Sequence, residues 1–189
     1  MSLSTLLRLT LFLTVLGTTV HAAPQALPGR VVGVTDGDTV TLLDAQHTLH
    51  KIRLAGIDAP ESRMPYGQRA KAHLAALVFN KNVVALTRKQ DRYGRTIATL
   101  MRGQTDINLA MIEAGMAWHY RHYAKEQPAA EARAYALAEE QARDRGIGLW
   151  HDSEPTAPWA WRRSRRTHLS TLTTVTIVSG VVPRIWINL

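Results

Sequence analysis

The alternation of apolar and polar residues predicts three consecutive strands in the first third of the chain. The stretches RVVGVT (30–35) and TVTLLD (39–44) flank the turn sequence Asp-Gly-Asp (36–38), and LHKIRLAG (49–56) follows after a short polar break. Runs of β-branched and apolar residues separated by turn residues are typical of strands joined by hairpins. We therefore expect a β-meander over this part of the chain.

The residues that follow show helical and strand patterns in turn. Residues 66–81 place Ala70, Leu74, Leu77 and Val78 on one face of a helix, because residues three and four apart share a face. By the same reasoning, two further strands cover 82–87 and 95–103, two further helices cover 106–116 and 128–146, and 117–123 is extended. This order predicts an α+β fold, a five-stranded OB-type β-barrel with about three packed α-helices.

The beginning of the chain predicts its destination. One positive charge, Arg8, precedes the apolar stretch 9–20, and small residues follow at the positions that a signal peptidase reads. This pattern predicts a signal peptide over 1–22, cleaved after about Ala22, and therefore an exported protein, periplasmic or extracellular. The alternative is a buried N-terminal helix. The apolar run is too short for a comfortable membrane span.

Composition divides the remainder into a short linker (23–28), one domain (29–150) and a C-terminal tail (151–189). The tail begins with a part rich in Pro, Trp and Arg. Its arginine cluster at 162–166 either holds nucleic acid or anionic lipid or is only solvated. The last part is apolar but interrupted by Gly, Pro and Arg, so we expect an accessory or disordered tail with at most a weak membrane contact.

The charge of the chain indicates a polyanionic partner. Lys and Arg number 23 against 15 Asp and Glu, a formal net charge of +8. Nucleic acid, an anionic membrane and an acidic polymer would each suit that surplus. The chain has no cysteine, which excludes disulfides and any thiolate nucleophile or zinc ligand.

Acidic residues occur where the predicted strands end. Asp36 and Asp38 lie in the first turn, and Asp58 and Glu61 follow the third strand, where Pro60 prevents a regular helix. We expect these carboxylates to gather at one mouth of the barrel. Oxygen ligands without cysteine favour Ca²⁺ or Mg²⁺ over zinc.

Two arginines complete a possible site for phosphate chemistry. Arg53 lies near the end of the third strand, and Arg95 follows the turn sequence DRYG. A guanidinium group can bind two phosphate oxygens at once and remains charged. Carboxylates, a divalent cation and two arginines suit phosphoryl transfer. Each feature alone has a simpler explanation. Asp-Gly is a common hairpin turn, and Arg53 shares its strand face with Lys51, a residue type that is usually exposed to solvent.

Four motifs together are more specific than any one of them. VTDGDTV (34–40), IRLAGIDAPE (52–61), YGQRAK (66–71) and DRYGRTIA (91–98) occur in this order and at these gaps. The series resembles the thermonuclease family, the micrococcal or staphylococcal-type nucleases, over about residues 29–150. The resemblance implies an OB barrel with three helices, in agreement with the pattern above.

The resemblance also implies a calcium site. Its ligands would be the carboxylates of Asp38 and Asp58 and the backbone carbonyl of Ala59. Asp36 is not a ligand in this family, so we interpret it as a turn former.

The catalytic residues implied by the resemblance are Arg53, Arg95 and Glu61. The glutamate would act as general base or position the attacking water. Tyr93 matches a tyrosine near the bound phosphate, and Tyr123 one of two tyrosines that flank the nucleotide. Arg121 stands where the family has the other tyrosine, which puts the base-stacking contact in doubt.

We therefore expect an exported calcium-dependent nuclease that hydrolyses phosphodiester bonds of DNA and RNA with little sequence preference and leaves 3′-phosphate ends. Its partner would be nucleic acid, with no obligate protein partner. The alternative is a non-catalytic OB-fold module that binds single-stranded nucleic acid.

Overall fold

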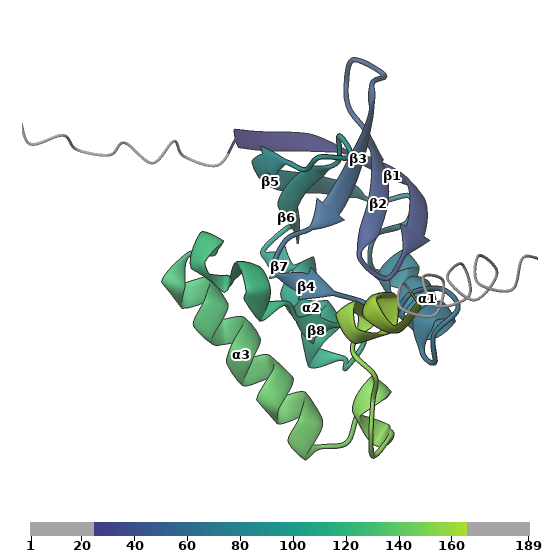
Figure 1. Ribbon diagram of the computed structural model, residues 1–189. Coiled ribbons are helices and arrows are strands. Elements are labelled where there is room, and N and C mark those ends of the chain that lie inside the picture. Colours follow the sequence, from purple (N-terminus) through teal and green to yellow (C-terminus); the bar gives the residue numbers. More distant parts are fainter. Residues whose placement is uncertain (1–24, 166–189) are drawn as a thin grey trace, which may run out of the picture.

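The computed structural model describes residues 25–165, so the predicted signal peptide and the apolar end of the predicted tail lie outside the described residues. The chain forms a sheet that closes into a barrel, with α3 packed beyond one end of it (Figure 1). The barrel strands are β1 (Gln25–Asp36), β2 (Thr39–Leu43), β3 (Leu49–Leu54), β5 (Asn82–Gln90) and β6 (Thr96–Arg102). The predicted α+β fold with a five-stranded OB-type barrel is confirmed.

The barrel closes through a parallel pairing between β3 and β6. The other neighbours along the barrel are antiparallel, and β3 then returns to β6 with Arg53 opposite Ile97. Paired residues on adjacent strands present their side chains to the same face. The closure therefore brings the turn that carries Arg95, just before β6, beside the strand that carries Arg53.

The barrel interior is filled by the side chains that alternate inward. Val31, Leu42 and Leu100 are fully buried, as are Ile52 and Leu54 on the face of β3 that the alternation predicts to be apolar. This register leaves the opposite face of β3 for its charged residues.

The helices occupy the predicted places with shorter ends. They are α1 (Gly67–Val78), α2 (Ile107–Glu113) and α3 (Ala129–Asp144). In α1 the buried residues include Ala70, Leu74 and Val78, which confirms most of its predicted apolar face. Among residues 25–165, no helix combines the length and the hydropathy that crossing a membrane requires.

The segment 117–123, predicted to be extended, is only partly so. Its start forms the short strand β8 (Trp118–His119), which pairs with β4 (Ile57–Asp58). The 3₁₀ helix η1 (Arg121–Glu126) follows at once. Because β4 offers only two residues to pair with, the ladder ends there and the chain turns.

Secondary structure is present on both sides of the predicted domain, residues 29–150. The first residues of β1 pair with β5, so the part of the predicted linker 23–28 that is described belongs to the barrel. After the second 3₁₀ helix, η2 (Gly148–His151), residues 158–165 are helical and lie beside α1 (Figure 1). We call residues 158–165 the C-terminal helical segment; they fall within the predicted tail.

A buried asparagine joins α2 to the barrel. Asn108 is fully buried. Its Oδ1 accepts a hydrogen bond from the N–H of Leu100 at 3.0 Å, and its Nδ2 donates to the carbonyls of Ala55 and Ala98 at 2.9 and 3.2 Å. The side chain thereby satisfies three backbone groups that water cannot reach.

We expect Asn108→Ala to lower the free energy of unfolding by about 3 kcal/mol or more, because each buried backbone group left without a partner costs about 1–3 kcal/mol. Urea denaturation followed by circular dichroism measures the change. Asn82→Ala, at the exposed start of β5, is the control and should change stability by no more than about 0.5 kcal/mol. Equal losses in the two variants would contradict the role given to Asn108.

Candidate active site

The turn Asp36-Gly37-Asp38 is both a hairpin and part of a buried site. The carboxylate of Asp36 accepts the N–H of Asp38 at 3.1 Å, which fixes the turn, and Asp38 itself is buried. A Cβ atom at Gly37 would lie 2.7 Å from the Cβ atoms of both Ala59 and Ala70. Glycine is therefore needed for the turn to pack against α1 and the loop after β4.

Arg53 connects two of the predicted acidic residues. Its Nη2 lies 3.1 Å from Oδ2 of Asp38 and 3.0 Å from Oδ1 of Asp58. Its Nη1 donates to the carbonyls of Leu54 and Ile57, each at 3.0 Å. The guanidinium group is thus held by four oxygens and is largely buried rather than solvated.

Burial makes this cluster of charges costly. Burial raises the pKa of Asp38 to about 7, with Asp36 and Asp58 also raising it and Arg53 lowering it. Burial likewise raises the pKa of Asp58, against the lowering effect of Arg162 and Arg53. A desolvated pair of carboxylates carries more negative charge than Arg53 alone offsets, so a second positive group is favoured beside Asp58, the place that Arg162 occupies here.

The donor chemistry fits a hard divalent cation. The backbone N–H of Ala59 donates to Oδ2 of Asp38 at 2.8 Å, so the peptide of Ala59 lies directly against that carboxylate. Asp38, Asp58 and the carbonyl of Ala59 would supply oxygen ligands, as Ca²⁺ requires. In residues 25–165 there is no group of three or more His, Cys, Asp or Glu side chains arranged to hold a metal. A cation here would depend on backbone oxygen, water or substrate for its remaining ligands.

Glu61 lies in the loop between β4 and α1, with its side chain about half exposed. Its backbone carbonyl accepts the N–H of Met64 at 2.8 Å. A Cβ atom at Gly67 would lie 2.0 Å from that same carbonyl oxygen, so the start of α1 can approach the loop only because residue 67 is glycine.

Arg95 and Tyr93 lie together at the β5–β6 turn. Arg95 forms an ion pair with Asp91 at 2.7 Å, and its guanidinium lies 5.7 Å from the ring centre of Tyr93, which is exposed. Among the described residues, Arg95 makes no hydrogen bond or ion pair with the central carboxylates, those of Asp38, Asp58 and Glu61. The β3–β6 register places the turn that carries Arg95 beside β3, because Thr96, the next residue, pairs with Ile52, the neighbour of Arg53.

The two predicted nucleotide contacts near η1, Tyr123 and Arg121, have different surroundings. Tyr123 is half exposed, with Nζ of Lys89 5.1 Å from its ring centre. Arg121 forms an ion pair with the buried Glu139 at 3.0 Å. Its guanidinium group is therefore bound to α3 rather than to the central carboxylates. Burial raises the pKa of Tyr120, and the charge of Asp58 raises it further.

The arginine cluster at 162–166 supplied a site residue that sequence reasoning did not assign. Nη2 of Arg162 lies 2.6 Å from Oδ2 of Asp58, and its Nη1 lies 2.8 Å from Oε1 of Glu61. A hollow of about 490 Å³ adjoins this contact and is lined by Glu61, Ser62, Arg63, Trp161, Arg162 and Arg165. Only the basic composition of the cluster pointed to it, and the partners are about a hundred residues away.

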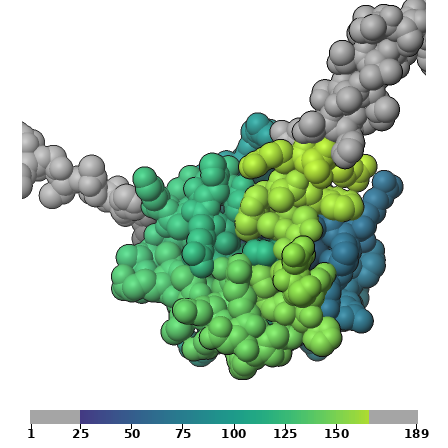
Figure 2. Space-filling view, turned by 60° about the horizontal axis from the view of Figure 1, so that its bottom comes forward, coloured from purple at the N-terminus to yellow at the C-terminus, as the bar shows by residue number. Residues whose placement is uncertain are grey.

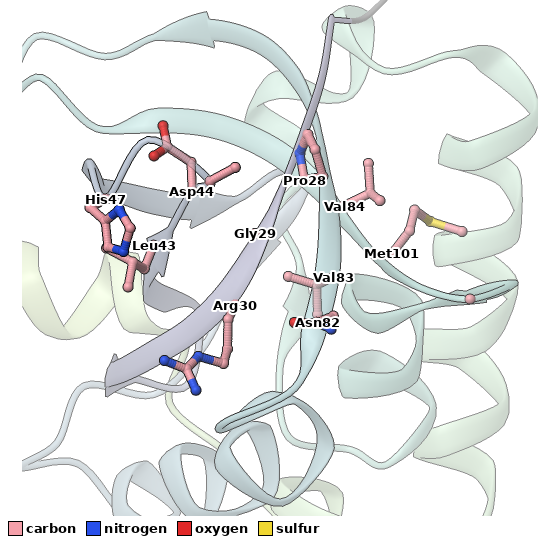
Figure 3. A pocket seen from close by; sticks show the side chains of 12 residues that line it. Pro28, Gly29, Arg30, Leu43, Asp44, His47, Asn82, Val83, Val84 and Met101 are labelled. Carbon is pink, nitrogen blue, oxygen red and sulfur yellow. The ribbon is translucent and has the colours of Figure 1, made fainter.

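A second hollow lies elsewhere on the barrel and does not share this chemistry. Its volume is about 580 Å³, and Gly29 of β1 lies in it between Leu43 on one side and Val83 on the other (Figure 3). None of its lining residues is a predicted site residue. Asp44, its only carboxylate, already accepts hydrogen bonds from two backbone N–H groups and His50.

Because Asp38 is ionised at a cost, we expect Asp38→Asn to raise the free energy of unfolding, measured in chelator at pH 8, by about 1–2 kcal/mol. The folded pKa lies above the unfolded value of 3.8, so the cost is full above about pH 7. It shrinks as the pH falls from 7 and disappears only below the unfolded pKa of 3.8, where Asp38 is protonated in both states. The gain should therefore shrink between pH 7 and pH 4 in a series of urea titrations.

Asp91→Asn is the contrasting control for Asp38→Asn. Burial acts to raise the pKa of Asp91, but hydrogen bonds from the backbone and side chain of Arg95 lower it below its usual value. Its neutralisation should reduce stability at pH 8. A loss of stability in Asp38→Asn as well would contradict the view that Asp38 is held in an unfavourable charged state.

Known proteins are similar to this chain over most of its length. The family described as staphylococcal nuclease homologue matches residues 51–152. An uncharacterized endonuclease of Haemophilus influenzae is 41% identical over 141 residues, which cover 75% of this chain and 76% of that protein. A micrococcal nuclease of Shigella flexneri is 41% identical over 147 residues, 73% of this chain and 82% of its own length. The chain therefore belongs to the staphylococcal nuclease family, as the four sequence motifs predicted.

Proposed function

We propose that the chain is an exported calcium-dependent endonuclease that hydrolyses phosphodiester bonds of DNA and RNA with little sequence preference. The observation that carries the proposal is the convergence of Asp38 and Asp58 on one guanidinium group, with Glu61 at the edge of the same cluster. Family membership supports nuclease chemistry, since relatives carry the names endonuclease and micrococcal nuclease. The net charge of +8 suits a polyanionic substrate.

Asp38, Asp58 and the backbone carbonyl of Ala59 would hold the calcium ion. When bound, the ion would polarise the scissile phosphate and offset charge that develops on its oxygens. The excess of buried carboxylate over the single positive charge of Arg53 supports this assignment, because a desolvated acid gains from each further positive neighbour.

Arg53 and Arg95 would donate hydrogen bonds to the phosphate. The two terminal nitrogens of Arg53 are bonded to protein oxygens in this structure. Nη2 of Arg53 can donate to a phosphate oxygen only when the carboxylate of Asp38 or Asp58 binds another cation in place of Arg53. Arg95 keeps one ion pair, to Asp91, and its turn lies beside the strand that carries Arg53. A guanidinium near a phosphate stabilises the transition state because it remains charged throughout.

Glu61 would accept a proton from water or position it. The water oxygen would bond to phosphorus while the bond from phosphorus to the 5′-oxygen breaks, and the departing oxygen would take up a proton. The products would be a 3′-phosphate and a 5′-hydroxyl. The half-exposed side chain of Glu61 supports this role, because a buried glutamate would not meet solvent water.

Tyr93 and Tyr123 are the exposed rings that would contact the nucleotide. Tyr120 is better placed than Arg121 to supply the second ring near η1, since Arg121 is paired with Glu139. Export would follow from the N-terminal pattern of charged, apolar and small residues. That part of the proposal stands on the sequence alone.

Cleavage assays with denatured DNA, duplex DNA and RNA test the proposal. We expect cleavage with Ca²⁺ and none with chelator. Glu61→Gln and Arg95→Ala should each reduce kcat by about 10²–10³-fold or more, because each removes a group that acts on the transition state. Glu113→Gln, at the exposed end of α2, removes the same charge away from the site and should leave kcat unchanged.

The alternative function is a module that binds single-stranded nucleic acid without cutting it. Tight binding with no cleavage under any divalent metal would favour that alternative. Cleavage that persists in both Glu61→Gln and Arg95→Ala would mean that the catalytic residues are misassigned.

A further inference from the structure

The C-terminal helical segment returns to the carboxylates of the candidate site. Arg162 places Nη2 at 2.6 Å and Nη1 at 3.4 Å from the two oxygens of Asp58, and the same Nη1 at 2.8 Å from Glu61. Figure 2 shows this segment, in yellow, lying across the surface between the blue and green parts of the chain. One side chain of the predicted tail thus contacts a predicted metal ligand and the predicted general base together.

An aromatic cluster holds the segment in place. The ring centre of Trp159 lies 5.5 Å from that of Trp118, which in turn lies 4.3 Å from that of Trp150, both edge to face. The ring centre of Trp159 also lies 5.4 Å from that of Tyr120. Edge-to-face aromatic pairs stabilise a contact beyond the area they bury. The segment therefore has an anchor that is independent of Arg162.

Arg162 and a cation cannot both occupy their places at Asp58. A calcium ion would lie about 2.3–2.6 Å from a carboxylate oxygen. With Oδ1 bonded to Arg53 and Oδ2 bonded to Arg162, both oxygens of Asp58 already face positive charge. A divalent ion on the same oxygens would stand a few ångströms from a guanidinium in a poorly hydrated place, where repulsion is strong. One of the two must leave.

The ion pair also changes what Glu61 can do. The Oε1 atom of Glu61 is bonded to Arg162, so it is not available there to a water molecule. The same contact therefore opposes both requirements of the proposed chemistry.

We propose that the C-terminal helical segment is an intramolecular inhibitor in which Arg162 occupies Asp58 and Glu61 in place of the divalent cation. The inference rests on the proposed function, because it takes Asp58 as a cation ligand. Cation and segment then compete, and the protein is active when Arg162 has left. Bonding to carboxylates does not by itself separate this role from phosphate binding, because Arg53 is also bonded to Asp58. Calcium affinity measured without nucleic acid does separate them.

Calcium affinity, measured by isothermal titration calorimetry on the full chain without nucleic acid, tests the competition. Arg162→Gln should bind Ca²⁺ about tenfold more tightly than the unchanged chain, because the competing charge is lost. Trp159→Ala should also bind more tightly, by about threefold, because it weakens the anchor without altering the carboxylates. Arg145→Gln, an exposed arginine on the C-terminal side of α3, removes the same charge and should leave the affinity unchanged.

Hydrogen exchange gives a second measurement that does not depend on activity. Adding Ca²⁺ to the unchanged chain should speed amide exchange in residues 158–165, because the cation displaces them. Unchanged exchange, or equal calcium affinity in Arg162→Gln and the unchanged chain, would overturn the proposal. A raised KM for nucleic acid with equal calcium affinity in Arg162→Gln would overturn it in favour of phosphate binding.

Asp58→Asn separates this inference from the proposed function. If Asp58→Asn abolishes calcium binding while Arg162→Gln has no effect on it, the cation site stands and the inhibitory role of the segment is wrong. If Asp58→Asn binds calcium as the unchanged chain does, the cation site itself is wrong and the inhibitory role is overturned with it.

Discussion

The structure around the site depends on the burial of two carboxylates against one guanidinium group. Asp38 and Asp58 each come within about 3 Å of Arg53, and burial raises the pKa of both acids. Arg53 alone does not offset two negative charges removed from water, and Arg162 supplies the second positive group at Asp58. The cluster is therefore held in place by the barrel rather than holding the barrel together. A site that is incomplete in this way favours whatever cation can reach it.

The barrel supplies that constraint through a few close approaches. Gly37 lets the first turn contact Ala59 and α1, and Gly67 lets α1 begin against the carbonyl of Glu61. The parallel closure of β3 on β6 places the turn that carries Arg95 beside the strand that carries Arg53. Each contact joins parts of the chain that are distant in sequence. Rigid placement of this kind reduces the reorganisation that a reaction would need.

Local patterns predicted the elements well, and contacts between distant segments poorly. Alternation and helical spacing located the barrel strands and the helices α1, α2 and α3, though not the C-terminal helical segment, because each pattern reflects which face of its own element is buried. The β4–β8 pair could not be predicted, since two residues are too few to show a period. The motifs located Asp38, Arg53 and Asp58, which the structure brings together. They gave no sign that Arg121 pairs with Glu139, or Arg162 with Asp58, because ion pairs leave no periodic trace.

The same excess of negative charge explains why an arginine from the tail would settle at this site. Attraction to Asp58 and Glu61 does not distinguish a guanidinium from a metal ion; geometry and hydration do. A guanidinium donates hydrogen bonds in a plane and stays tethered to the chain, so its local concentration is fixed by the segment that carries it. A calcium ion accepts oxygen ligands from all sides, and its occupancy depends on its concentration in solution. Competition between Arg162 and calcium would therefore make the fraction of sites that hold calcium depend on the calcium concentration around the protein.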